Sequence, residues 1–466
     1  MLCIISRQML RWFFQEDPVM RMAMTKPLFA WECLEDSPSL GTVREVLGAI
    51  PDERLLAALG AYRWKGRDDY PVPVLWAVVV LTAVLRHVTT EATLGELKRN
   101  PSLRALIGIE TEEKVPKKWN VSRFMKVLGR QEHVELLREV FDEMIRRLGT
   151  AVADLGRQTA GDATHLRARR EENEADEGLP RADGGRKEYT DERGQVTRVL
   201  EWFGYKLHLL IDSRHEVALA YQITSPKVAD VERLPGLVEE AENNLPKDRM
   251  NTLAYDKAAD AEEVHRFLKG KRIAPVIENR SLWKEEFERM LPDHDGTSHV
   301  VYDEAGTVYC YDTVSKVPRR RAMSYIGHEA KRGTLKYRCP ARHEDFPCAS
   351  EKMCNAGKAY GKTVRVKRQI DLRRFPPIPR ATKTFERLYK GRSAVERVNA
   401  RLKIFWGSDD GNITGARRFH ALVGTVLIVH AAFATCLAMT PRYEGTLGKL
   451  HLSHLAKALR EKVTVA

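Results

Sequence analysis

The hydrophobic pattern of this chain changes at about residue 157, and this change constrains the fold more than any other feature. Before it, residues 46–150 read as helical: they contain a helix-length apolar run, short periodic pieces and, at 133–148, apolar side chains close to i, i+3, i+4 and i+7 spacing. After it come three segments that look like strands, at 158–166, 202–211 and 217–223. A helix–strand–helix–strand pattern then continues to residue 278. This order predicts an α/β fold, a mixed sheet flanked by helices and preceded by a small all-helical domain.

Residues 281–384 interrupt the α/β pattern. This segment has several short strand-like runs and contains four of the chain's seven cysteines. Between residues 310 and 392 the chain has 22 Lys and Arg against 7 Asp and Glu, a net charge of +15, whereas the whole chain has +13. Tyrosines are interleaved with these cations. We therefore expect a β-rich basic insertion that binds nucleic acid, with an ordinary solvated surface as the alternative.

Two helices are expected after the insertion. Residues 384–406 have the pattern of one long amphipathic helix, and a second helix from about 417 to 439 contains the longest apolar run of the chain, at 419–439. The second segment is long enough to cross a membrane, but it contains His420 and His430. A buried core helix is therefore the better interpretation.

Composition places the chain among soluble intracellular proteins. With 43% hydrophobic and 30% charged residues it is neither disordered nor fibrous. Seven cysteines in 466 residues are too few for a disulfide scaffold. The apolar N-terminal run lacks the cleavage site of a signal peptide. We expect a cytoplasmic protein that does not act in a membrane.

The helix expected at 384–406 carries an unusual set of polar residues. Tyr389, Arg392, Glu396 and Lys403 are spaced by 3, 4 and 7 residues. On a continuous α-helix at about 100° per residue they share an arc of about 60°, beside an apolar stripe. A carboxylate framed by two cations and a phenol can be a surface ion-pair set or part of a functional site.

Two aspartates of the expected sheet are candidate partners of Glu396. Asp162 lies within a strand, where an unpaired carboxylate is costly. Asp256 ends a strand, which is the usual position of a site in an α/β sheet. Asp260 competes with Asp256 for this role, and a helix cap is the alternative for either. Carboxylates converging from several elements are the oxygen ligands that Mg²⁺ prefers.

The motifs resemble those of bacterial insertion-sequence transposases of the Asp-Asp-Glu (DDE) class. The stretch LYKGRSAVERVNARLKIFWG matches their Tyr-x2-Arg-x3-Glu-x6-Lys signature, and GDAT is similar to their first-aspartate strand. Segments before and after these motifs are also similar, so the resemblance covers about residues 50–440. Ala258 and Ala259 depart from the pattern, because the family usually has Gly and an aromatic residue there.

The resemblance implies an RNase H-like catalytic core that cleaves and joins phosphodiester bonds at the inverted-repeat ends of an insertion sequence. It implies that Asp162, Asp256 and Glu396 bind two Mg²⁺ ions, for which Mn²⁺ can substitute. Tyr389, Arg392 and Lys403 would bind DNA. Transposon ends and target DNA would be the partners, a homodimer would form on DNA, and the protein would associate with the nucleoid when bound.

Five regions follow from the patterns and the resemblance together. We expect an N-terminal extension at 1–45, a helical end-recognition domain at 46–150 and a basic insertion at 281–384. The catalytic core would combine 151–280 with 385–440, and a C-terminal tail would follow at 441–466.

Two other functions remain open at this stage. One is a catalytically silent, transposase-derived DNA-binding protein, and the other is a plain RNase H-like nuclease. The intact order of three carboxylates favours an active transposase. In relatives that flip a base against an aromatic residue of the insertion, Trp283 would be the candidate, although a packed tryptophan is the simpler interpretation.

The cysteines of the insertion form a separate question. Cys339, Cys348 and Cys354 are spaced by 9 and 6 residues, with Cys310 upstream. This is not the Cys-x2-Cys spacing typical of structural zinc. Reduced thiols and a zinc site in the insertion are therefore both open.

Overall fold

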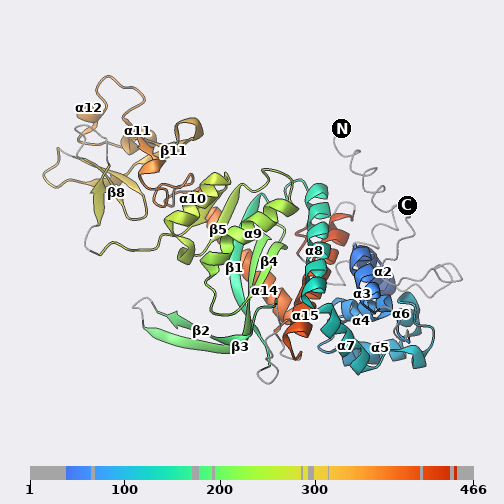
Figure 1. Ribbon diagram of the computed structural model, residues 1–466. Coiled ribbons are helices and arrows are strands. Elements are labelled where there is room, and N and C mark those ends of the chain that lie inside the picture. Colours follow the sequence, from blue (N-terminus) through green and yellow to red (C-terminus); the bar gives the residue numbers. More distant parts are fainter. Residues whose placement is uncertain are drawn as a thin grey trace, which may run out of the picture. The chain divides into compact units, whose positions relative to one another are not determined.

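The computed structural model describes residues 38–63, 69–169, 178–191, 195–284, 287–291, 299–312, 314–409, 413–440 and 445–448. These residues form two compact units, which we describe separately (Figure 1). The first unit comprises 1–156, 162–249 and 394–466, and the second comprises 157–161 and 250–393. The domain limits proposed from the sequence, including the extension at 1–45 and the tail at 441–466, stay predictions, and both ends lie largely outside the described residues.

The first unit begins with the helices expected from the sequence. Their bounds are α2 Pro38–Gly48, α3 Glu53–Arg63, α4 Val72–Val84, α5 Thr90–Arg99, α6 Pro101–Leu106, α7 Lys118–Leu128 and α8 Gln131–Ala151, with a 3-10 turn η2 at Glu112–Lys114. Local sequence signals set the starts of two of them. The Thr89 side chain accepts from Ala92 N and caps α5, and the Asn100 side chain accepts from Leu103 N and caps α6. The helical N-terminal region is therefore confirmed.

The long helix α15, Ala416–Ala438, is the centre of this unit's core. It packs against α4, α7 and α8 and against strand β4, Val217–Thr224. It is the one described helix long and apolar enough to cross a membrane, and 83% of its most apolar window is buried inside the protein. Its apolar side chains thus have protein partners, as expected of a core helix.

The strands of the first unit are built around a long hairpin. Strand β2, Asp183–Thr190, pairs antiparallel with β3, Val196–Asp212, which in turn pairs antiparallel with β4. Helix α9, Asp230–Asn244, packs on β3 and β4. Gly204 permits the approach of β3 to β1, Gln158–Arg167, because its φ is +152° and a Cβ there would stand 2.0 Å from the Leu166 carbonyl oxygen.

The second unit contains the parallel part of the sheet. The first residues of β1 pair in parallel with β5, Thr252–Tyr255, and β5 pairs in parallel with β6, Ala274–Ile277. The strand order is β2-β3-β1-β5-β6, with β4 paired to β3. Helix α10, Glu262–Gly270, joins β5 to β6 after a 3-10 turn η4, Lys257–Ala259. The mixed sheet flanked by helices is therefore confirmed.

The insertion adds two small antiparallel sheets to the second unit. One contains β7 Glu288–Met290, β8 Val300–Asp303, β9 Val308–Tyr311 and β10 Arg320–Ala322, and the other contains β11 Ser324–Glu329, β12 Thr334–Arg338 and β13 Thr363–Lys367. Short helices lie between these strands, namely η5 Ala330–Arg332, α11 Pro340–Glu344, α12 Glu351–Cys354 and η6 Arg368–Ile370. The sheets share one apolar cluster, to which Val308, Leu335 and Phe375 contribute fully buried side chains. The β-rich character expected of the insertion is confirmed.

The expectation of one continuous helix over 384–406 is wrong. The segment instead forms α13 Lys383–Lys390, α14 Ser393–Ala400 and a π-helical turn η7 Arg401–Phe405. α13 belongs to the second unit and α14 to the first. Because the helical phase is interrupted at Gly391 and again at the π turn, the common 60° arc does not hold. The apolar residues of 384–406 keep a helical spacing across these breaks, so the sequence pattern did not reveal them.

Candidate active site

Asp162 and Asp256 stand at matching positions on neighbouring strands. The parallel register pairs Ala160 of β1 with Ala254 of β5. Each aspartate follows its paired alanine by two residues. Both are half-buried, and the three residues directly before each of them are buried. Asp256 thus stands at a strand end, where α/β sheets place their functional groups, whereas Asp162 lies within β1, two residues after the last residue of β1 that pairs with β5.

The local role of Asp256 is that of a cap. Its Oδ1 accepts a hydrogen bond from Ala258 N at 2.7 Å and begins the 3-10 turn η4. This contact uses one carboxylate oxygen and fixes the side chain at the end of β5. The cap interpretation and a ligand role are therefore compatible, because a carboxylate has lone pairs for both.

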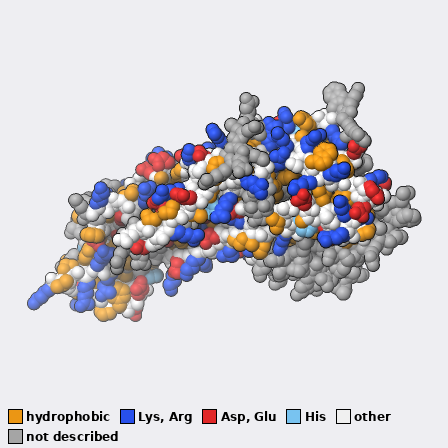
Figure 2. All heavy atoms as spheres, turned by 90° about the horizontal axis from the view of Figure 1, so that it is seen from below, with side chains coloured by type: hydrophobic (Ala, Val, Ile, Leu, Met, Phe, Trp, Pro, Cys, Tyr) orange, Lys and Arg blue, Asp and Glu red, His pale blue; other side chains and the backbone are white. Residues whose placement is uncertain are grey.

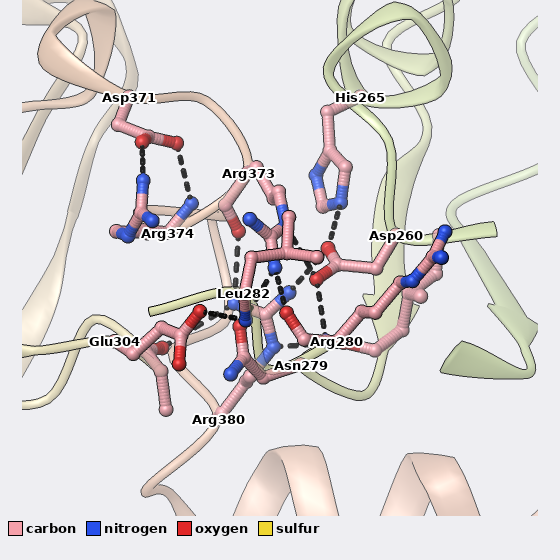
Figure 3. A network of polar contacts seen from close by, with 12 residues as sticks. Asp260, His265, Asn279, Arg280, Leu282, Glu304, Asp371, Arg373, Arg374 and Arg380 are labelled. Carbon is pink, nitrogen blue, oxygen red and sulfur yellow. Dashed lines mark hydrogen bonds and ion pairs between the residues drawn. The ribbon is translucent and has the colours of Figure 1, made fainter. Parts of the chain in front are cut away.

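Asp260 is committed to a different task. Its side chain is fully buried and accepts hydrogen bonds from Arg373 Nε at 2.6 Å, Arg380 Nη2 at 2.9 Å and Arg280 N at 2.8 Å (Figure 3). His265 Nε2 is 3.0 Å from Oδ1. Burial alone would raise the pKa of the Asp260 carboxyl, but these hydrogen bonds and charges hold it below its usual range. A carboxylate so completely engaged has no capacity left for a metal ion, so Asp256 is the better candidate.

The Asp260 network joins both ends of the insertion to the sheet. Arg280 stands where the chain leaves β6, and Arg373 and Arg380 stand where it returns before α13 (Figure 3). Arg380 also donates to the carbonyls of Ile277, at 2.9 Å, and Arg373, at 2.8 Å. The network therefore fixes the position from which α13 starts.

Helix α13 positions Tyr389 near Asp256. The ring of Tyr389 stacks on Phe385, with centroids 5.8 Å apart, and the Arg392 guanidinium lies 5.9 Å from the Tyr389 centroid. Burial and the hydrogen-bonded carboxylate of Glu278 raise the pKa of Tyr389 to about 12, and Asp256 contributes in the same direction. The phenol is therefore a proton donor at neutral pH, with a cation beside it.

Glu396 and Lys403 lie in the first unit. Glu396 is exposed in the first turn of α14, and its neighbour Arg397 pairs with Glu216 at 2.7 Å. Lys403 lies in the π turn, only 15% exposed, with Nζ 3.6 Å from Asp409 Oδ2. Burial lowers the pKa of Lys403. Asp409 also accepts from Arg167 N at 2.5 Å, so it holds Lys403 beside the end of β1.

The proposed ligands have the donor chemistry for a hard cation. Three carboxylates supply oxygen atoms, which Mg²⁺ and Mn²⁺ prefer over nitrogen and sulfur. Within the part of the chain that the structure describes, no three His, Cys, Asp or Glu side chains form a preformed metal site. Asp162 and Glu396 belong to the first unit and Asp256 to the second. The chemical type of these three ligands, all of them carboxylates, is therefore what makes them suitable for Mg²⁺.

Some cations of the insertion are buried, and others are exposed. Arg368 and Arg373 are only 8% and 7% exposed, and they support the fold instead of a DNA surface. Lys316, Arg319, Lys331 and Arg332 are exposed. On the face shown in Figure 2, Lys and Arg side chains are interspersed with Asp and Glu. A DNA-binding surface would thus use the exposed cations.

Trp283 is packed within the insertion. The guanidinium groups of Arg289 and Arg374 lie 4.3 Å and 4.7 Å from the centroid of its ring, and the ring of Tyr302 is beside it. It also packs against the apolar cluster of the insertion. These contacts agree with the simpler interpretation of Trp283 as a packed tryptophan.

Sequence reasoning missed two carboxylates of this region. Glu278 directly follows β6 and contacts Tyr389, and the strand-end rule that selected Asp256 could have found it. Asp409 holds Lys403 and the end of β1. No sequence signal marks Asp409, because its partners are brought to it only by folding.

Comparison with known families gives two matches. A family model described as a transposase DDE domain matches residues 153–431, more than half of the chain. A second model, described as a transposase domain (DUF772), matches residues 32–127. No curated protein matches the chain.

Proposed function

Because this chain belongs to the family of DDE transposases, we propose that it is an active transposase that cleaves and joins phosphodiester bonds at the inverted-repeat ends of an insertion sequence. The family acts on DNA by nuclease chemistry, on the RNase H-like α/β fold expected from the sequence. The observation that carries the proposal is the parallel register of β1 and β5, which precedes Asp162 and Asp256 by the same two residues.

In this proposal Asp162, Asp256 and Glu396 hold two Mg²⁺ ions. When bound, the ions supply Lewis-acid chemistry that activates a water or 3′-hydroxyl nucleophile and stabilises the leaving oxygen. The nucleophile's oxygen forms a bond to phosphorus as the bond to the 3′-oxygen breaks, and the leaving oxygen becomes a hydroxyl. The carboxylates of this chain position the reacting phosphate by fixing the ions to rigid strands and a helix.

Tyr389, Arg392 and Lys403 are proposed to hold the DNA backbone. The neutral phenol of Tyr389 would exchange its hydrogen bond to Glu278 for one donated to a phosphate oxygen near Asp256. Arg392, beside the Tyr389 ring, would add a charge-assisted contact. Lys403, partly neutralised by Asp409, would exchange that partner for a phosphate or share it.

The rest of the chain is assigned to DNA recognition. The N-terminal helices, which overlap the second family match, would recognise the transposon end. The exposed cations of the insertion would bind DNA phosphates without reading sequence. We propose that the protein acts as a homodimer on its two ends, in the cytoplasm and bound to the nucleoid.

Nicking of an end-containing duplex tests the function. The element's terminal sequence would be incubated with the protein and Mg²⁺, and strand cleavage followed on a denaturing gel. We expect Asp162→Asn, Asp256→Asn and Glu396→Gln each to abolish cleavage while retaining end binding within a few fold, since the groups hold metal and not backbone.

The matched control is Glu386→Gln. Glu386 is an exposed carboxylate on α13 that pairs with Lys390, so its loss should leave cleavage unchanged. Full cleavage activity of Asp256→Asn would show that Asp256 is not a metal ligand of the active site. Tight end binding without any cleavage by the wild-type protein would instead favour a catalytically silent descendant.

A further inference from the structure

The four cysteines of the basic insertion converge on one small cavity. Cys310 lies in β9, Cys339 directly follows β12, Cys348 precedes α12, and Cys354 ends α12. All four line a cavity of about 30 Å³, together with His299 and Lys362. This volume suits a single ion or water molecule and excludes an organic ligand.

A frame of hydrogen bonds holds these cysteine-bearing segments together. Ser350 Oγ donates to Asp312 Oδ1 at 2.9 Å, which ties the loop of Cys348 to the end of the strand of Cys310. Cys339 N donates to the Lys362 carbonyl at 2.8 Å, and Lys362 N donates to Asn355 Oδ1 at 2.6 Å. Residues distant in sequence are thus fixed beside one another before any ligand binds.

The polar groups at the cavity suit thiolates. Asn355 Nδ2 lies 3.7 Å from Cys339 Sγ, within reach of an N–H···S hydrogen bond. His299 Nε2 lies 3.9 Å from Cys354 Sγ and 2.9 Å from Lys362 Nζ. A donor and a cation among four sulfur atoms would stabilise negative charge on them.

The buried apolar side chains of the segment between β12 and β13 are small and lie at its start, at Cys339, Pro340 and Ala341. The buried cluster of the insertion draws its described residues from 291–337 and 364–375, and none from 339–362. That segment holds three of the four cysteines and only two short helices. A cross-link at the cysteines would fix it where the apolar core does not.

We propose that Cys310, Cys339, Cys348 and Cys354 form a structural zinc site. Four thiols would bind one Zn²⁺ with release of four protons, giving a tetrathiolate of net charge −2. The Lys362 ammonium would offset part of that charge. In the described residues the four groups line the cavity without yet forming a closed metal site, so the thiols must turn about χ1 toward the ion.

Zinc content of the full-length protein tests the proposal. Protein purified with zinc and without chelator should contain one zinc per chain. Cys339→Ser and Cys348→Ser should lose it, whereas Cys436→Ser, a buried cysteine of α15, should retain it. Lys362→Gln should bind zinc at least about tenfold more weakly in competition with a chromogenic chelator.

Thiol alkylation of the wild-type protein tests the site without relying on variants that must fold. Zinc should protect the four insertion thiols, and a chelator should expose all four to alkylation and residues 339–362 to protease. Re-added zinc should restore both. Absence of bound zinc, retention of zinc by Cys339→Ser, or a disulfide among these cysteines in the non-reduced protein would overturn the site. None of these readouts depends on DNA cleavage.

Discussion

Asp256 and Asp260 are close in sequence and identical in type, but they have different roles in the structure. Both lie between β5 and α10, and both fit a helix cap or a ligand from sequence. Folding gives Asp256 a position at the strand end and gives Asp260 two arginines and a histidine. The two aspartates differ because hydrogen bonds and ion pairs occupy both carboxylate oxygens of Asp260.

We expect Asp260→Asn to destabilise the second unit. Removing the charge leaves two buried guanidinium groups uncompensated, which typically costs about 3–5 kcal/mol. Hydrogen exchange of residues 371–380 should accelerate strongly. Asp371→Asn, which removes a partner of Arg374 in the same segment but is less buried, is the control and should change exchange much less. Unchanged exchange in Asp260→Asn would contradict a structural role.

Lys403 requires an experiment that separates stability from DNA binding. Lys403→Met removes the ion pair between Lys403 and Asp409 and should lower the melting temperature. The double variant Lys403→Met/Asp409→Asn should restore most of the melting temperature. If Lys403 also contacts DNA, end affinity should stay about tenfold low in the double variant, a loss of about 1.4 kcal/mol. Restoration of both would make Lys403 purely structural.

At the scale of elements, the segment after the insertion is the most informative. Helix α13, helix α14 and the π turn divide what the sequence presents as one helix. The break at Gly391 separates Tyr389 and Arg392 from Glu396, and the π turn reorients Lys403 relative to Glu396. π turns are frequent at functional sites because they place side chains off the regular helical phase.

Helix α15 makes a pH dependence of stability predictable. Burial lowers the pKa of His420 to about 4 and that of His430 to about 3. Unfolded histidines take up protons below about pH 6.5, whereas the folded ones stay neutral until about pH 4. Stability should therefore be complete above pH 7 and fall with decreasing pH, by at most about 1.4 kcal/mol per pH unit for each histidine.

Urea midpoints at pH 7.5 and 5.5 measure this effect. His420→Phe keeps a ring beside Tyr205 and Phe419 but cannot be protonated. Its midpoint should fall less between the two pH values than that of the wild type. An equal fall in both proteins would assign the pH dependence to other groups.

At the scale of the whole molecule, net charge predicts binding that depends steeply on salt. The basic excess lies in residues 310–392, and its exposed members should release counterions from DNA. Lys331→Gln/Arg332→Gln removes two exposed cations of the η5 turn and should lower the log–log salt slope by roughly two if both contact phosphate.

Arg146→Gln is the control for this slope, because Arg146 is a half-exposed cation of α8 outside the insertion. Its slope should match that of the wild type. If the salt slope of DNA binding were unchanged in the double variant but reduced in the control, the phosphate contacts would have to lie on the N-terminal helices and not on the insertion.

The sequence by itself determined the fold class, the insertion, the core helix α15 and the family, because these depend on periodicity, composition and motif spacing along the chain. Only the tertiary structure decided that 384–406 is broken, that Asp260 is structural, that Arg368 and Arg373 are buried, and that four distant cysteines line one cavity. These outcomes depend on which groups far apart in the chain become neighbours, and burial and pairing are properties of those neighbours and not of local sequence.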